Sequence, residues 1–502
     1  MTANDATPQV PQPEAGPRRS VIRSLSGWND WARLLPLIAL AVALGLIGLG
    51  SKGLWVDEGL SAAIARFDPV GVLKAAWSTP TPGAIALYYE ILHFWTILGN
   101  SEFVLRLLSV LCTALAVPII YFLGVRLAGS RAATVAAFLV AASPFVVEYS
   151  QEARPYAMVL LLSAASSLAL LRAIEQPTWR RWIAYAVLAI ASLYVHNTMA
   201  FVLIVHGIWA LITVPIRDRQ FWRVVVAFGA IGLSALPLAG LLSEAPFTWV
   251  PQLTLSWLTS VLRSVAGGTR PLLAFWLGAV ALGTIAALRR LMQGRVGWSM
   301  ALAVALGLVP ILIEVAISMR RPMLEERYLM VSVPGLAVCA GIGIAAIPWN
   351  KIRWLAVALF VGLAVVALIP WYTGEPKEGW REAEQIISAG FRPGDGIVVY
   401  PEYCRLPFDY YIVQDASLSS RAVPVYPAVA WGTYFPALEE GPPLSSSLSR
   451  MSAGGRLWIV SRYVPLDTST ADGKTLWSHL SGYKTVETIH LTDVYVQLLQ
   501  SP

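Results

Sequence analysis

The stretch Leu54-Trp55-Val56-Asp57-Glu58-Gly59-Leu60-Ser61 follows the first long apolar run of the chain and places two adjacent carboxylates near a tryptophan. Two later stretches, residues 149–156 (YSQEARPY) and residues 320–328 (RRPMLEERY), also follow apolar runs and combine charged with aromatic side chains. We expect all three stretches to meet on one face of a membrane and to form a single active site.

The composition is that of a membrane protein. Of 502 residues, 56% are hydrophobic and 13% are charged, against about 25% charged residues in soluble domains. Apolar runs of about 17–25 residues, long enough to cross a bilayer core of about 30 Å, recur through the first three quarters of the chain. The runs lack the alternation of barrel strands, so the sequence predicts a bundle of membrane helices.

Charge and cysteine content do not indicate a nucleic-acid-binding, disulfide-rich or metal-binding protein. The net charge of +7 does not point to nucleic acid, because much of the basic charge lies in short loops, as the positive-inside bias requires. Cys112, Cys339 and Cys404 lie far apart and form neither a disulfide framework nor a metal-binding spacing. A divalent metal is possible, but no motif indicates one.

Loop charge fixes the predicted topology. Residues 1–32 form a polar, arginine-containing tail that we expect to be disordered and cytoplasmic, and residues 33–371 form the membrane module. The stretch 82–99 is long enough to span, but Glu90, His93 and four aromatic residues suit a helix on the outer surface. With that choice, most arginine-rich loops fall on the cytoplasmic side. Eleven spans follow: 34–50, 103–125, 132–147, 157–174, 182–195, 199–214, 224–242, 272–288, 299–318, 329–347 and 354–371.

Residues 372–502 differ from the rest of the chain, because hydrophobicity falls and turn residues become frequent. Residues 379–387 predict an amphipathic helix and residues 393–396 a turn. Residues 397–400, 456–460 and 494–498 predict strands. We therefore expect a small α/β domain on the extracytoplasmic side.

The paired acids of the first outer loop suit acid–base chemistry. Asp57, next to an indole in a partly dry cleft, is our candidate general base for an attacking hydroxyl. Glu58 either binds the acceptor or orients Asp57. The alternative is that both acids belong to a solvated loop end.

The outer arginines suit an anionic ligand. The guanidinium group of Arg154 suits the binding of phosphate oxygens. Pro155 and Glu152 also fit the capped start of a helix. Arg320, Arg327 and Tyr328 lie where the chain re-enters the membrane, and we expect them at the same phosphate. The alternative is a turn in which two neighbouring glutamates neutralise the arginines. Since a nucleotide-binding fingerprint is missing from the sequence, a lipid-carried donor fits better than a soluble one.

These stretches, in this order, resemble the GT-C integral-membrane glycosyltransferases, in the superfamily of protein O-mannosyltransferases and lipid A aminoarabinose transferases. Asp57-Glu58 is similar to the acidic motif of their first outer loop, and 149–156 and 320–328 are similar to later loop motifs. Residues 378–383 (EGWREA) resemble the helix that often opens the outer domain of bacterial members. The aminoarabinose transferases carry a lysine before the proline of the surface helix, where this chain has Thr81.

The resemblance implies an inverting glycosyltransferase of the inner or plasma membrane. It would use a polyprenyl-phosphate sugar, act on a hydroxyl of a cell-envelope acceptor and require no cofactor. Asp57 would be the base, Glu58, Glu152 and His196 would bind the acceptor or support the site, and Arg154, Arg327, Tyr328 and Arg320 would hold the donor phosphate. A transporter or flippase of a lipid-linked or anionic solute is the alternative, and a non-catalytic scaffold is the third reading.

Overall fold

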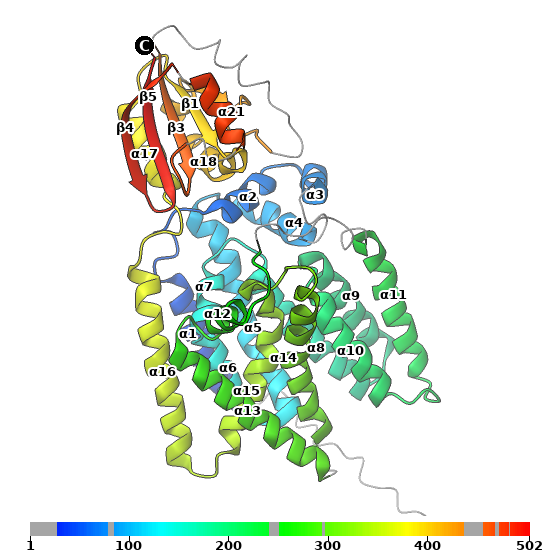
Figure 1. Ribbon diagram of the computed structural model, residues 1–502. Coiled ribbons are helices and arrows are strands. Elements are labelled where there is room, and N and C mark those ends of the chain that lie inside the picture. Colours follow the sequence, from blue (N-terminus) through cyan, green and yellow to red (C-terminus); the bar gives the residue numbers. More distant parts are fainter. Residues whose placement is uncertain are drawn as a thin grey trace, which may run out of the picture.

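The computed structural model describes residues 28–78, 85–239, 250–293, 297–435, 455–466, 471–480 and 482–501. The structure has three layers, which Figure 1 shows from bottom to top: a bundle of long helices, a layer of short helices from the first loop, and a C-terminal domain with a sheet. The predicted fold class, a helical membrane protein with a C-terminal α/β domain, is confirmed. Most of the tail that we expected to be disordered, residues 1–27, lies outside the described residues.

Long apolar helices build the lower layer, and each of the eleven predicted spans overlaps at least one of them. The helices are α1 (Trp28–Leu46), α5 (Glu102–Ala128), α6 (Ser130–Ala141), α7 (Pro144–Ser150), α8 (Tyr156–Glu175), α9 (Trp179–Val195), α10 (Met199–Thr213), α11 (Phe221–Ala239), α13 (Arg270–Met292), α14 (Gly297–Ser318), α15 (Val333–Ala346) and α16 (Asn350–Thr373).

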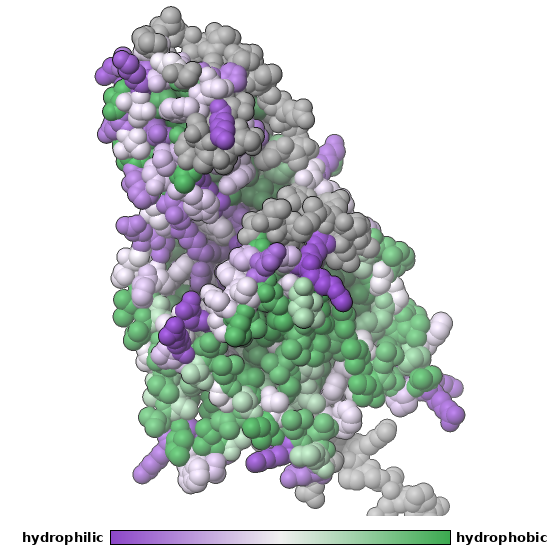
Figure 2. Space-filling model, viewed as in Figure 1, coloured by the Kyte–Doolittle hydropathy of each residue, from purple (hydrophilic) through white to green (hydrophobic). Residues whose placement is uncertain are grey.

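Seven helices in the described part of the chain are long and apolar enough to cross a membrane, or eight if the bent pair α6 and α7 counts as one. The predicted span 132–147 is therefore not straight: α6 and α7 meet at 55°. The bend occurs where Ser143 accepts a hydrogen bond from the Val146 N–H and Pro144 begins the new helix. Figure 2 shows the apolar surface of this layer as a broad band, with hydrophilic residues gathered above it.

Close helix contacts depend on small residues, as is usual in membrane bundles. At Gly341 in α15, an added Cβ would lie 2.3 Å from the backbone oxygen of Ala132 in α6. Any larger side chain would therefore push the two helices apart.

Short helices of the first loop form the middle layer: α2 (Val56–Ala65), α3 (Pro69–Ser78), α4 (Ala86–Trp95) and the 3-10 turn η1 (Thr96–Leu98). Helix α4 has 10 residues, about 15 Å of rise, and cannot cross a bilayer core of about 30 Å. This length agrees with the surface helix predicted from 82–99, of which residues 82–84, together with Thr81, lie outside the described part. The segment between the predicted spans 224–242 and 272–288 contains the helix α12 (Leu255–Val265).

The C-terminal domain has a five-stranded mixed sheet in the order β2-β1-β3-β5-β4. The strands are β1 (Gly396–Tyr400), β2 (Val423–Tyr426), β3 (Arg456–Arg462), β4 (Lys484–Leu491) and β5 (Val494–Gln500); β1 is parallel to β2 and β3, and β5 is antiparallel to β3 and β4. Helices α17 (Trp380–Gly390), α18 (Arg405–Ile412), α19 (Ala416–Ser419) and α21 (Ala471–Leu480) accompany the sheet. The sequence predicted α17, β1, β3 and β5 but not β2 or β4.

The C-terminal domain shares its core with the first loop. Trp380 of α17 and Phe408 of α18 belong to the same buried cluster as Leu54 and Val56. Gly59 of α2 lies so close to α18 that an added Cβ would be 2.6 Å from the backbone nitrogen of Pro407. The domain is therefore packed directly on the helix that begins at the acidic motif.

Candidate active site

The three charged stretches meet, as the sequence predicts. Asp57 lies in the first turn of α2, Arg154 in the loop between α7 and α8, and Arg327 in η3 (Glu326–Ser332), a 3-10 helix that leads into α15. The Asp57 Oδ2 lies 3.3 Å from Arg327 Nη1 and 3.7 Å from Arg154 Nη2. One carboxylate thus lies between two guanidinium groups that are far apart in the sequence.

The Asp57 side chain is more exposed to solvent than the two arginines beside it. The side chain of Asp57 is 27% exposed, against 7% for Arg154 and 14% for Arg327. With one carboxylate and two guanidinium groups, the cluster carries a net charge of +1 (+2 − 1). A neighbouring acid, Glu325, lies 4.0 Å from Arg327, but burial, followed by repulsion from Glu326, raises the pKa of Glu325 to about 7. Near neutral pH, Glu325 therefore only partly cancels the positive charge.

Arg154 is held on several sides. Its Nη1 donates to the Asp57 carbonyl oxygen at 3.2 Å and lies 3.4 Å from both Ser61 Oγ and Tyr89 OH. Its Nε is buried and has no hydrogen-bond partner among the described residues. Tyr89, from α4, is a site residue that sequence reasoning missed, since it stood out only as one of four aromatics in the surface helix.

Glu58 turns away from this cluster. The residue is 1% exposed, and its carboxylate accepts two hydrogen bonds from Arg106 of α5, at 2.8 and 2.6 Å, and one from the Ala153 N–H at 2.8 Å. Arg106 also donates to the carbonyl oxygens of Leu49, Lys52 and Gly53. Glu58 is therefore a support that anchors α2 to α5. The signal that could have identified Arg106 is a charge inside an apolar helix.

Glu152 forms an ion pair with Lys377, which precedes α17 and also contacts Glu148 at 3.2 Å. Burial raises the pKa of Glu152 to about 7 against the opposing effect of Lys377. Burial alone would lower the pKa of Lys377, but Glu152 and Glu148 outweigh it and raise that pKa, so the ammonium stays charged. Sequence reasoning missed Lys377 because it lies beyond the last span.

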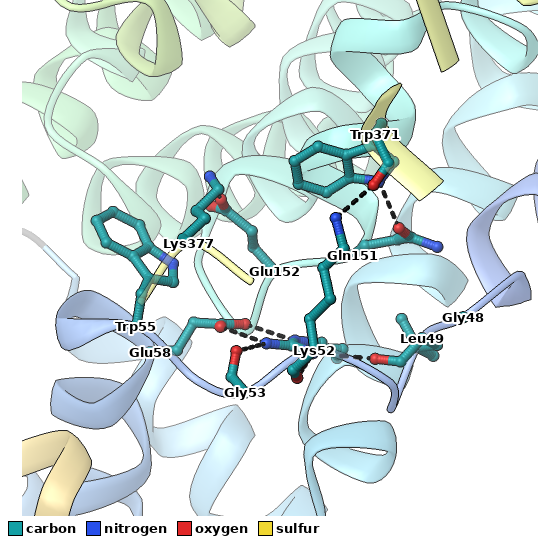
Figure 3. Close-up of a pocket in the computed structure, with 11 residues that line it drawn as sticks. Gly48, Leu49, Lys52, Gly53, Trp55, Glu58, Gln151, Glu152, Trp371 and Lys377 are labelled. Carbon is teal, nitrogen blue, oxygen red and sulfur yellow. Dashed lines mark hydrogen bonds and ion pairs between the residues drawn. The ribbon is translucent and has the colours of Figure 1, made fainter. Parts of the chain in front are cut away.

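These groups surround a small cavity of about 30 Å³. Figure 3 shows Trp55, Lys377 and Glu152 on one side of it and Trp371 with Gln151 on the other. The Lys377 ammonium lies 5.0 Å from the ring centre of Trp55 and 5.5 Å from that of Trp371. This volume is large enough to hold ordered water.

His196 and Tyr328 pack together behind the arginines. The ring of His196 lies 5.3 Å from that of Tyr328 and 5.8 Å from that of Tyr156, and its Nδ1 lies 2.9 Å from Thr198 Oγ1. Burial, with further repulsion from Arg154 and Arg327, lowers the pKa of His196 to about 3. A neutral, buried imidazole supports Tyr328.

Arg320, which the sequence predicts at the donor phosphate, does not lie with the other predicted site residues. It is exposed in the turn after α14, and no ion pair joins it to Asp57 within the described residues. These residues also contain no group of three or more His, Cys, Asp or Glu side chains arranged to hold a metal ion.

Comparisons with known proteins support the same fold. A model of the dolichyl-phosphate-mannose-protein mannosyltransferase family matches residues 83–242. A search of curated protein sequences finds no match. Among solved structures, ArnT from Cupriavidus metallidurans in the apo state matches with a TM-score of 0.59 and 14% identity, over 94% of this chain and 98% of that chain. The same protein bound to undecaprenyl phosphate gives equal values.

Two further solved structures are similar in fold at lower TM-scores. An oligosaccharyltransferase from Archaeoglobus fulgidus matches with a TM-score of 0.51 and 12% identity, over 93% of this chain and 72% of that chain. The arabinofuranosyltransferase AftD from Mycobacteria matches with a TM-score of 0.51 and 16% identity, over 95% of this chain and 42% of that chain. The chain is thus a multi-pass membrane protein with the GT-C fold of membrane glycosyltransferases, and the resemblance seen in its sequence is confirmed.

Proposed function

We propose that the protein is an inverting glycosyltransferase that moves a sugar from a polyprenyl-phosphate donor to a hydroxyl of a cell-envelope acceptor. The observation that carries the proposal is the Asp57 carboxylate between Arg154 and Arg327, at 3.7 and 3.3 Å. The residues that we propose as general base and as phosphate ligands therefore lie in contact with one another. The family match and the structure of ArnT bound to undecaprenyl phosphate support a lipid-linked donor.

In the proposed reaction, the acceptor oxygen bonds to the anomeric carbon as the bond between that carbon and the phosphate oxygen breaks. Asp57 takes the hydroxyl proton, and polyprenyl phosphate leaves. Arg154 and Arg327 stabilise the charge that grows on the departing phosphate, and the hydroxyl of Tyr328 can donate to it. The arginines supply the positive charge, so the step balances without a metal or another cofactor.

Donor binding also changes the surroundings of Asp57. Without a ligand, the two arginines contact Asp57; a phosphate, with its several oxygens, competes for the same N–H groups. The net charge of +1 in the cluster favours this exchange. Asp57 is then released toward the acceptor, on the side where it is already exposed.

The site belongs, in this proposal, on the extracytoplasmic face, with the N-terminus in the cytoplasm. Loop charge supports this orientation, because most arginine-rich loops then fall on the cytoplasmic side. The arginines of the site are a local exception to this bias, which an anionic ligand would explain. The C-terminal domain is then extracytoplasmic as well, and the membrane is the inner or plasma membrane.

The test uses the purified full chain in detergent with a panel of polyprenyl-phosphate sugars and a membrane-lipid and glycan extract as acceptor source. We expect release of polyprenyl phosphate from one preferred donor, and loss of release in Asp57→Asn with donor binding retained. The matched control is Asp68→Asn, which removes an exposed acid of the same loop whose Oδ1 accepts from the Gly71 N–H at 2.7 Å.

Substantial turnover by Asp57→Asn would overturn the base assignment. Binding of the lipid phosphate without release from any donor would favour the transporter. The panel thus separates a wrong residue from a wrong function.

A further inference from the structure

Helix α2, which carries Asp57, begins without a cap of its own. The residue at its N-cap position, Trp55, makes no side-chain cap hydrogen bond. The first N–H groups of a helix have no partner within the helix and need an acceptor from elsewhere. A carboxylate is the preferred acceptor there, because it also meets the positive end of the helix dipole.

The acceptor comes from the C-terminal domain. The Glu378 Oε2 accepts a hydrogen bond from the Val56 N–H at 3.0 Å. Val56 is the first residue of α2 and the immediate neighbour of Asp57. Glu378 thus caps a helix that begins more than 300 residues earlier in the chain.

The capping carboxylate is itself fixed by its own domain. Its Oε2 also accepts from the Trp380 Nε1–H, and its Oε1 forms an ion pair with Arg462 at the end of β3. Glu378 is 2% exposed and Trp380 is fully buried. The position of the carboxylate is therefore set by α17 and β3 of the C-terminal domain as well as by its contact with α2.

Further contacts from the same domain hold the approach to α2. Tyr411 OH accepts from the Leu54 N–H at 2.6 Å, and Arg381 donates to the Ser51 carbonyl oxygen at 2.8 Å. On the far side of Asp57, Gly59 packs against Pro407. The domain thus contacts α2 and its approach before and after the proposed base.

From this geometry we infer that Glu378 is a positioning residue for Asp57, and that the C-terminal domain is a part of the catalytic site which sets the orientation of the base. The inference rests on the proposed function. Removing the cap frees the first turn of α2 to shift, and a displacement of about 1 Å can cost about 100-fold in rate. The donor phosphate is held by other elements, so its binding should be spared.

The chain offers a closely matched control. Asp395 is also 2% exposed, and its carboxylate also accepts from one arginine, Arg456, and one indole, that of Trp458. Asp395 immediately precedes β1 and, unlike Glu378, receives its remaining hydrogen bond from within the domain, from the Arg392 N–H. Asp395→Ala therefore reports the cost of losing such a carboxylate without touching α2.

The experiment measures kcat, the KM for the donor and polyprenyl-phosphate binding for the wild type, Glu378→Ala and Asp395→Ala, each below its own unfolding temperature. We expect Glu378→Ala to lose about 100-fold in kcat with unchanged donor binding, and Asp395→Ala to keep its kcat. Glu378→Gln, whose amide oxygen can still accept from Val56, should recover part of the loss.

An equal loss of kcat in both alanine variants, or a loss in Glu378→Ala confined to donor binding, would overturn the inference while leaving the transferase standing. Absence of transfer in the wild type would instead overturn the proposed function. If Glu378→Ala does not fold, Glu378→Gln against Asp395→Asn decides: a lower kcat in the first alone supports positioning, and equal values refute it.

Discussion

Replacing Arg106 by methionine tests whether the buried ion pair under the acidic motif holds the site in place. Methionine keeps much of the length and apolar surface of the arginine but donates no hydrogen bond. The change would strip the Glu58 carboxylate of its two bonds from Arg106 and leave it with one, from the Ala153 N–H. The Arg106 and Glu58 side chains are 5% and 1% exposed, so the change leaves a buried carboxylate without its charged partner.

The size of the effect follows from this burial. A hydrogen bond to a charged group contributes about 1.5–3 kcal/mol, and removing one partner of a buried ion pair costs about 3–5 kcal/mol. We expect Arg106→Met to lower the free energy of unfolding by about that amount. Glu58→Gln should cost less, because Arg106 keeps its three carbonyl partners.

The assay is a double-mutant cycle on unfolding free energies in mixed micelles, followed by the fluorescence of the 20 tryptophans. When Arg106→Met is introduced into the Glu58→Gln background, no carboxylate is left unpaired, so the substitution should cost at least about 1.5 kcal/mol less than in the wild type. An equal cost in both backgrounds would show that the two residues are not coupled and would refute the reasoning.

Two further predictions concern packing and pH. Gly59→Ala should reduce both stability and transfer, because the added methyl group would lie 2.6 Å from the Pro407 backbone. The control Gly229→Ala, whose added methyl group would have nothing within 4 Å, should be neutral or slightly stabilising. Melting curves and turnover rates test both variants. Burial and the Asp415 carboxylate raise the pKa of Glu384 to about 7. Between about pH 4.5 and 7 the folded state therefore binds more protons than the unfolded state, so the stability of the wild type should fall as the pH rises through this range. The decline of the melting temperature should be smaller in Glu384→Gln, in which Glu152 and Glu325, whose pKa values are also raised to about 7, still contribute. Parallel curves for the variant and the wild type would contradict the assignment.

The sequence predicted what depends on local pattern. The apolar runs gave the membrane helices, and the charged ends of those runs gave Asp57, Arg154 and Arg327, which do meet. The bend between α6 and α7 had a local signal as well, the pair Ser143-Pro144 inside an apolar run. It was missed because continuous hydropathy outweighed the helix-start signal.

What the sequence did not predict are partners set by tertiary packing. The pairs Arg106–Glu58 and Lys377–Glu152 join residues from different layers, and their spacing in the chain carries no periodic signal. The cap of α2 by Glu378 is the extreme case. Such pairs depend on how the layers pack on one another, so one sequence alone does not encode them as a pattern.

The adjacent acids Asp57 and Glu58 show how packing assigns roles that residue type leaves open. Successive side chains on a helix point about 100° apart, so two neighbouring carboxylates in the first turn of α2 cannot face the same surroundings. Glu58 points inward and is matched by a single arginine, which leaves no charge for a ligand. Asp57 points to the open side, beside two arginines that exceed it by one positive charge. Only Asp57 would gain or lose its partners when a phosphate binds, and for this reason we propose Asp57 for the chemistry and Glu58 for the support.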